Sequence, residues 1–190
     1  MIKQLFFFIV IVSSNLLFAA DGTTLKPVLI DLNNKASLQR GAQIYINNCF
    51  GCHTLKYQRY VKFVDHLSLP KETIENNLIF TTDKNGEKTK IGSLMLNAVH
   101  PTSSKEAFGV MPPDLTLIAR SRGPEWLYTF LISFYKDESR PLGVNNSLYS
   151  NVGMPHVLAW MEGLKVPTSK NGKYEYISEG TLSLIHISEP

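Results

Sequence analysis

Cysteine is scarce in this chain, with only Cys49 and Cys52 among 190 residues. Both belong to one short motif, so no thiol is left for a disulfide or for a separate metal site. No second pair of cysteines or histidines stands at ligand spacing, which leaves a structural zinc site incomplete. The formal net charge is only +3, too small to indicate binding to nucleic acid or to an anionic membrane. The sequence contains no internal repeat, and its length suits one medium-sized domain.

The sequence Cys-Phe-Gly-Cys-His at residues 49–53 is the most informative feature that is present. It has the Cys-x-x-Cys-His form of the attachment motif for a c-type haem. Each thiol can form a thioether bond to one vinyl group of the haem, and His53 then lies under the iron as its proximal ligand. A thioredoxin-like dithiol would need a βαβ setting, which the flanking residues do not indicate. The motif therefore predicts one covalently attached haem c, with a zinc-binding interaction domain as an alternative.

The two ends of the chain differ in composition from its centre. Residues 1–20 have a short basic start, an apolar run and a small-residue end, which is the layout of a cleaved secretory signal peptide. Residues 21–36 are expected to form an N-terminal arm, and residues 37–183 a cytochrome c domain that is incomplete at its C-terminus. Residues 184–190 look like a translated sequencing adapter and are expected to be a non-native tail. The signal indicates export, which agrees with haem attachment outside the bacterial cytoplasmic membrane.

Hydrophobic periodicity predicts a chain that is mostly α, with short helices and long loops around one cofactor. Leu38, Ala42 and Tyr45 belong to an apolar stripe on a first helix, with Ser37 as its candidate N-cap and an end near Asn48. The haem motif follows directly after that end, where the backbone can wrap around the porphyrin. The helices expected are residues 37–48, 71–78, 91–99, 115–120 and 125–135.

A stiff turn precedes the fourth of these helices. Pro112 and Pro113 fix its backbone, and Asp114 can cap the helix that follows. Arg120 ends that helix, so its guanidinium is a candidate partner for a haem propionate through paired, charge-assisted hydrogen bonds. The alternative for Arg120 is a solvated surface charge.

A haem that only transfers electrons usually has a second axial ligand, and methionine in that position raises the reduction potential relative to histidine. Met154 and Met111 both stand in loops before a proline, which can present the side chain rigidly to the iron. Met154 is favoured because a closing loop at that point can reach the distal face of the haem, and Met111 is the alternative. Met95 and Met161 fit helical patterns and are expected to pack in the core. The rival histidine ligands are His66, His100 and His156.

Three segments of the chain resemble the cytochrome c1 family, in the same order. Residues 40–45, which run into the haem motif, and residues 54–60 are similar to the family's haem region. Residues 112–122 resemble its Pro-Pro-Asp-Leu helix, and residues 151–158 resemble its methionine-ligand loop. Together these segments extend over most of residues 37–160.

The resemblance implies a class I cytochrome c-like fold and the haem subunit of the quinol–cytochrome c oxidoreductase. Such a subunit takes electrons from the Rieske iron–sulfur protein, passes them to a soluble cytochrome c and assembles with cytochrome b. It converts no substrate at a site of its own. The implied location is the periplasmic side of the bacterial inner membrane, with a C-terminal membrane anchor that we expect to be missing from this chain.

The resemblance also assigns roles to particular residues. Cys49 and Cys52 would be the thioether sites, His53 and Met154 the axial ligands, Arg120 a propionate contact, and Tyr57 and Pro112 further contacts of the haem. The alternative at this point is a free periplasmic c-type cytochrome, or a haem enzyme with an open iron site.

Overall fold

The computed structural model describes residues 24–167 and 174–177. The expected signal peptide at residues 1–20 and the expected non-native tail at residues 184–190 lie outside these described residues. Within the described ranges, seven helices occur together with three two-stranded antiparallel sheets, so the content is mixed rather than mostly α. None of the described helices is long and apolar enough to cross a lipid bilayer.

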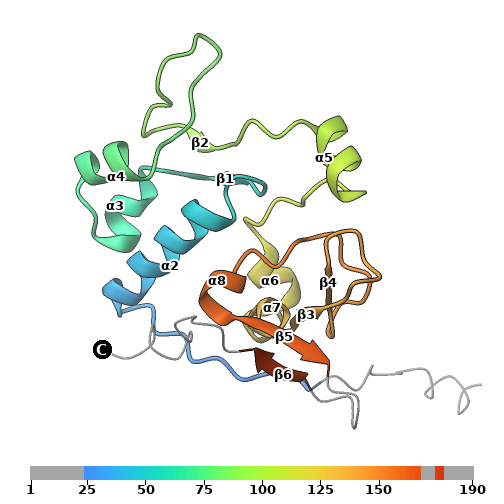
Figure 1. The fold of residues 1–190 in the computed structure, drawn as a ribbon. Coiled ribbons are helices and arrows are strands. Elements are labelled where there is room, and N and C mark those ends of the chain that lie inside the picture. Colours follow the sequence, from blue (N-terminus) through green and yellow to red (C-terminus); the bar gives the residue numbers. More distant parts are fainter. Residues whose placement is uncertain (1–23, 168–173, 178–190) are drawn as a thin grey trace, which may run out of the picture.

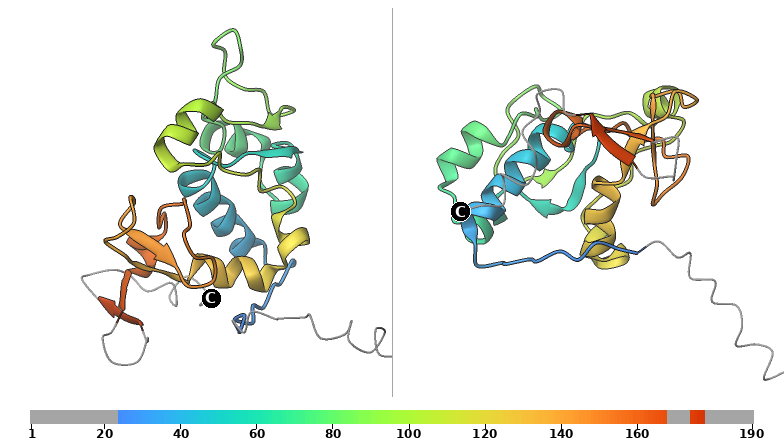
Figure 2. Two further views of the ribbon diagram at one scale, coloured as in Figure 1. Left: turned by 90° about the vertical axis from the view of Figure 1, so that its right-hand side faces the viewer. Right: turned by 60° about the horizontal axis from the view of Figure 1, so that its bottom comes forward.

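The elements fall on two sides of the molecule (Figures 1 and 2). The helices are α2 (Lys35–Asn48), α3 (Lys62–Leu67), α4 (Lys71–Asn77), α5 (Pro101–Phe108), α6 (Ile118–Arg122), α7 (Pro124–Leu131) and α8 (Ala159–Glu162). The strands are β1 (Leu55–Arg59), β2 (Leu94–Met95), β3 (Phe134–Lys136), β4 (Val144–Asn146), β5 (Leu164–Pro167) and β6 (Tyr174–Ile177). Helices α2, α3 and α4 lie on one side, and α7 lies on the other with the pairs β3–β4 and β5–β6.

Helix α2 is capped by a residue that lies before the expected start. The side-chain oxygen of Asn34 accepts a hydrogen bond from the backbone N–H of Ser37 at 3.0 Å. Asn34 is therefore the N-cap, the expected cap at Ser37 is wrong, and the helix begins at Lys35. The expected end at Asn48 is confirmed.

The first core, as we call it, gathers around α2, α3 and α4. Its buried members are Ile46, Phe50, Tyr60, Phe63, Leu67, Ile74, Leu78, Ile79 and Met95. Leu38, Ala42 and Tyr45 pack against this cluster, which confirms the apolar stripe predicted for the first helix. Burial of this stripe holds the C-terminal end of α2, and with it the haem motif, in a fixed position.

Residues 91–99 do not form the expected helix. Leu94 and Met95 instead form strand β2, in which Met95 pairs with Leu55 of β1. The Met95 side chain is fully buried in the first core. Pairing with β1 provides partners for the backbone hydrogen-bonding groups of β2. Together with burial of the Met95 side chain, it overrides the local helical pattern.

The second core, as we call it, lies on the other side of the molecule. Its buried members are Phe134, Val144 and Val152, and Phe130, Met154 and Leu164 pack against them. The helix expected over 125–135 ends earlier, at Leu131, because Phe134 turns into β3 and pairs with Asn146 of β4.

Two of the hydrogen bonds that join the two sides flank the haem motif. The ring N–H of Trp160 in α8 donates to the side-chain oxygen of Asn48 at the end of α2, at 3.0 Å. The backbone N–H of Leu115 donates to the carbonyl oxygen of Thr54, directly after the haem motif, at 2.9 Å. Both bonds are made beside the motif, so the two halves of the molecule meet there.

Gly153 allows the segment before Met154 to pass close to the end of α5. A Cβ at Gly153 would lie 2.8 Å from the carbonyl oxygen of Phe108 and 2.9 Å from a methyl group of Val110. Gly153→Ala is therefore expected to lower the free energy of unfolding by about 1–3 kcal/mol, because the backbone must move apart. Thermal and urea unfolding measure the loss.

Gly41→Ala is the matched control for this prediction. Gly41 lies within α2, and a Cβ there would meet nothing within 4 Å. Alanine favours a helix over glycine by about 1 kcal/mol, so this variant is expected to be as stable as the wild type or more so. A Gly153→Ala protein that unfolded at the wild-type midpoint would contradict the close approach.

Candidate functional site

The motif at residues 49–53 forms a closed turn at the end of α2. The carbonyl oxygen of Cys49 accepts hydrogen bonds from the backbone N–H groups of Cys52, at 3.0 Å, and His53, at 2.8 Å. The Tyr45 hydroxyl donates to the His53 carbonyl oxygen at 2.8 Å and ties the turn back to the helix. The Phe50 side chain is buried in the first core, whereas Cys49 and Cys52 are partly exposed. A haem can reach them there.

The ring of His53 is held by a backbone carbonyl group. Its Nδ1 lies 2.7 Å from the carbonyl oxygen of Pro113, and the residue is only 8% exposed. Since a carbonyl oxygen can only accept, Nδ1 must carry the proton and donate it. In a neutral ring Nε2 then keeps its lone pair, which is the tautomer that binds a metal. The position and tautomer of His53 therefore fit the proximal ligand of a haem iron.

The two cysteines are also suited to thioether formation. They are free, with no disulfide between them. Burial raises the pKa of the Cys49 thiol, and the neighbouring Cys52 raises it further, so the group remains a neutral thiol at pH 7. Within residues 24–167 and 174–177, no three His, Cys, Asp or Glu side chains are grouped so that they could hold a metal ion.

Asp114 joins the segment after the haem motif to the Pro-Pro turn. One of its oxygens accepts hydrogen bonds from the Thr54 hydroxyl at 2.6 Å and from the backbone N–H of Lys56 at 2.7 Å. The other oxygen accepts from the backbone N–H of Thr116 at 3.1 Å. Burial by itself would raise the pKa of Asp114, but these donors stabilise the carboxylate and lower the pKa to about 2.

The observed role of Asp114 differs from the expected one. Asp114 was expected to cap a helix over 115–120, but α6 begins at Ile118 and its N-cap, Leu117, makes no side-chain cap bond. The carboxylate is instead used between segments that are about 60 residues apart in the sequence. Spacing along the chain gave no signal for this contact; only its place beside Pro113 suggested that the turn mattered.

The remaining candidate residues lie in several different parts of the structure. Met154 is partly buried and packs against the second core, and Met111 is also partly buried. Arg120 is exposed in the last turn of α6. Tyr57 is 65% exposed on β1, and Pro112 is partly buried in the turn that holds His53. The described contacts bring the Pro-Pro turn to His53 directly, whereas Met154 is held by other parts of the chain.

The rival ligands have other partners. His66 is exposed at the end of α3, and His100 caps α5 by accepting the Thr102 N–H at 3.3 Å. The side chain of His156 is 3% exposed, and its ring stacks on Phe134 with the centroids 4.9 Å apart. Met95 and Met161 are buried, in agreement with the packing role expected for them.

Comparison with known proteins gives a consistent result. Residues 28–176 match the sequence model of the cytochrome c1 family. The chain is 43% identical over 156 residues to cytochrome c1 of Allochromatium vinosum, which covers 82% of this chain and 62% of that protein. It is 39% identical over 154 residues to the ammonia monooxygenase gamma subunit of Nitrosomonas europaea, covering 81% and 63% of the two chains. The chain is also 27% identical over 132 residues to cytochrome c1 1, a mitochondrial heme protein of Arabidopsis thaliana. The match covers 63% of this chain and 43% of that protein.

The attachment turn, the fixed histidine ring and these matches define a haem protein of the c type. The chain belongs to the cytochrome c1 family, and haem is its cofactor. It spans about three fifths of the length of the two bacterial relatives.

The lowered pKa of Asp114 makes part of the stability depend on pH. An unfolded aspartate has a pKa of about 3.9. The folded group, with a pKa of about 2, therefore adds stability above about pH 4 and loses it as the pH falls through about 2. Asp114→Asn is expected to lower the free energy of unfolding at neutral pH by about 1 kcal/mol, a modest value because the side chain is partly exposed. In the variant, the free energy of unfolding should also fall less steeply as the pH is lowered. Urea unfolding across this pH range measures the difference.

Asp31→Asn serves as the control for Asp114→Asn. Asp31 is exposed, and its carboxylate accepts from the Asn33 N–H, two residues away, at 2.8 Å. It joins no distant segments, so its removal is expected to change stability by less than about 0.5 kcal/mol. If Asp114→Asn lost stability in acid as steeply as the wild type, the carboxylate would not be the group that joins the two segments.

Proposed function

We propose that this chain is the electron-transfer haem subunit of a quinol–cytochrome c oxidoreductase. It takes electrons from the Rieske iron–sulfur protein and passes them to a soluble cytochrome c, in a complex that includes cytochrome b. The observation that carries the proposal is the His53 ring, fixed as a metal-binding tautomer within the haem turn of a cytochrome c1 family chain.

The haem turn supplies the attachment and the first ligand in this proposal. Haem, when bound, supplies an iron that changes between Fe(III) and Fe(II). Cys49 and Cys52 hold it through two thioether bonds. His53 offers Nε2 to the iron because Nδ1 is engaged by Pro113, which also prevents rotation of the ring.

Met154 would be the second residue to bind the iron in this proposal. Its side chain packs against the second core, and Gly153 before it passes close to the Phe108 backbone, so the loop has little freedom. A thioether sulfur in an apolar setting favours Fe(II). With both axial positions filled by the chain, the site suits transfer of electrons rather than binding of an external substrate. Met111 is the alternative ligand.

Three further residues contact the haem in this proposal. Arg120 makes no ion pair within the described part of the chain, so its guanidinium can meet a propionate. By contrast, the guanidinium carbon of Arg122 lies 5.1 Å from the centroid of the Trp126 ring and makes a cation–π contact there. Tyr57 and Pro112 lie on the two segments that Asp114 joins, and each can cover an edge of the ring.

The cellular setting follows from the same proposal. Residues 1–20 direct export as a signal peptide, and residues 37–183 form the haem domain, with a class I cytochrome c-like arrangement. The domain acts on the periplasmic side of the bacterial inner membrane. Location and partners are supported by membership of the cytochrome c1 family.

Electron exchange tests the proposed function directly. Rapid mixing of the oxidised haem-loaded protein with a reduced Rieske fragment is expected to reduce it, and an oxidised soluble cytochrome c is expected to reoxidise it. Both reactions follow from a haem whose potential lies between those of the two partners. If the protein exchanged electrons with neither partner, the chain would not be this subunit.

Carbon monoxide separates an electron relay from a haem enzyme with an open iron site. The reduced wild-type protein is expected not to bind carbon monoxide, because Met154 fills the sixth position. Met154→Leu should open that position, allow carbon monoxide to bind and lower the reduction potential. The absorption spectrum of the reduced protein measures the binding.

Met111→Leu is the matched control for the Met154 substitution. Both replacements exchange a partly buried methionine for leucine, and both residues precede a proline. The Met111 variant is expected to behave like the wild type. Carbon monoxide binding by Met111→Leu and not by Met154→Leu would move the ligand to Met111, and binding by the wild type would favour the haem enzyme.

A further inference from the structure

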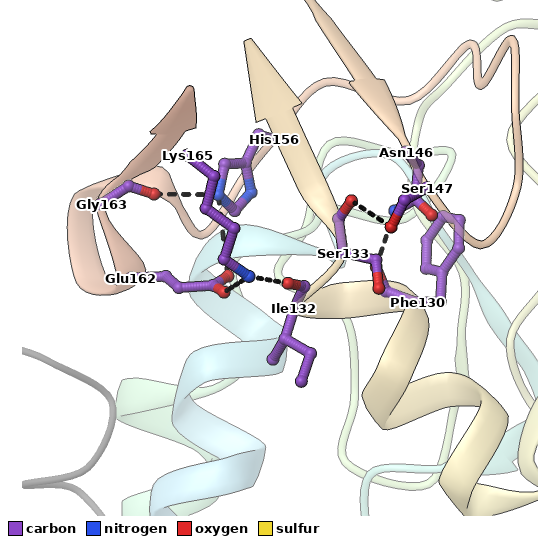
Figure 3. A network of polar contacts seen from close by, with 9 residues as sticks. All are labelled: Phe130, Ile132, Ser133, Asn146, Ser147, His156, Glu162, Gly163 and Lys165. Atoms are coloured by element: carbon purple, nitrogen blue, oxygen red, sulfur yellow. Dashed lines mark hydrogen bonds and ion pairs between the residues drawn. The ribbon is translucent and has the colours of Figure 1, made fainter. Parts of the chain in front are cut away.

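The segment that carries Met154 is fastened at both ends to the same helix terminus. It runs from the end of β4 to the start of β5, and both of these strands contact the region just after α7 (Figure 3). The last carbonyl groups of an α-helix have no partner within the helix. Side chains from either end of the segment reach these carbonyls, one before Met154 and one after it.

The anchor before Met154 is Asn146. Its side-chain N–H donates to the carbonyl oxygen of Phe130 in the last turn of α7, at 2.7 Å. Its side-chain oxygen accepts from the backbone N–H groups of Leu148, at 2.9 Å, and Tyr149, at 3.0 Å. Asn146 is 1% exposed, so its own amide group is shielded from water. One amide group thus shapes the first turn of the segment and attaches it to the helix.

The anchor after Met154 is Lys165. Its ammonium group donates to the carbonyl oxygen of Ile132 and lies 2.8 Å from the carboxylate of Glu162. The side chains of Lys165 and Glu162 are 12% and 6% exposed. Burying an ion pair costs desolvation energy, which the attraction offsets only where the geometry is good and further hydrogen bonds satisfy the two groups. The bond from Lys165 to Ile132 is such a further hydrogen bond.

A third contact lies between the two anchors. His156, two residues after Met154, stacks on Phe134. Its Nε2 lies 3.3 Å from the Gly163 carbonyl oxygen (Figure 3). The path from Met154 to Lys165 is therefore folded back on itself beside the second core. Fixing both ends of this path leaves Met154 few alternative positions.

We propose that Asn146 and Lys165 are positioning residues, which clamp the Met154 segment to the end of α7 and so keep the methionine sulfur at the iron. This inference rests on the proposed function, because it takes Met154 as the axial ligand. The proposal gives neither residue a contact with the haem. Their effect is on the fraction of molecules in which the sixth position is open.

Imidazole reports that fraction, because it binds to the ferric iron only where the methionine has left it. Its apparent affinity rises in proportion to the open population. Lys165→Met and Asn146→Ala are made in the haem-loaded protein. Each is expected to raise the apparent affinity for imidazole about tenfold, because it removes the hydrogen bonds of one buried anchor. Lys165→Arg keeps the cation and its donors and should return toward the wild-type value. Both substitutions should also lower the reduction potential. A purely structural role for these residues would leave the potential unchanged.

Lys136→Met is the matched control. Lys136 lies on the neighbouring strand β3 and pairs with Glu138, whose side chain is 80% exposed, so its removal should leave imidazole binding unchanged. Wild-type affinity and potential in both anchor variants would overturn the proposal. If one variant fails to fold, the other decides. Failure of both to fold would also overturn it, since the anchors would then support the whole chain rather than one segment.

The Met154 variant keeps this test separate from the test of the proposed function. If Met154→Leu bound imidazole no more tightly than the wild type, Met154 would not be the ligand and the proposed function would need revision. If it bound imidazole much more tightly while the anchor variants did not, only the anchors would be wrong.

Discussion

The hydrogen bond from the His53 ring to the Pro113 carbonyl is the contact on which the rest of the site depends. It fixes the proton on Nδ1, and in doing so it leaves Nε2 free for the iron. Pro113 can hold the ring only because Asp114 fastens the same turn to Thr54 and Lys56. The His53 ring, which we propose as the proximal ligand, is thus held by a backbone carbonyl group rather than by the flexible side chain of a second residue.

The two cores hold different parts of the site. The first core fixes the end of α2 and therefore the two thiols and His53, while the second core holds Met154. An electron carrier needs ligands that move little when the iron changes charge. Under the proposed function His53 and Met154 would be such ligands, each held by a different part of the chain. The proposed anchors, Asn146 and Lys165, would likewise hold the Met154 segment, which is otherwise a loop between two short strands.

Local features of the site could be predicted from the sequence, and non-local ones could not. The haem motif and the end of α2 at Asn48 could be predicted because each depends only on residues that are close together in the sequence. The clamp made by Asp114 joins segments about 60 residues apart, and no period or motif records that distance. Strand β2 was missed for the same reason, since Met95 pairs with Leu55 across a long loop.

The central claim is that His53 and Met154 hold the haem iron from opposite sides. Near-infrared magnetic circular dichroism of the oxidised, haem-loaded protein tests it most directly, because the energy of the ligand-to-iron charge-transfer band identifies the pair of axial ligands. The account predicts the low-spin band of a histidine–methionine pair. A band at the energy of two histidines, or a high-spin signal from an iron with an open position, would contradict it.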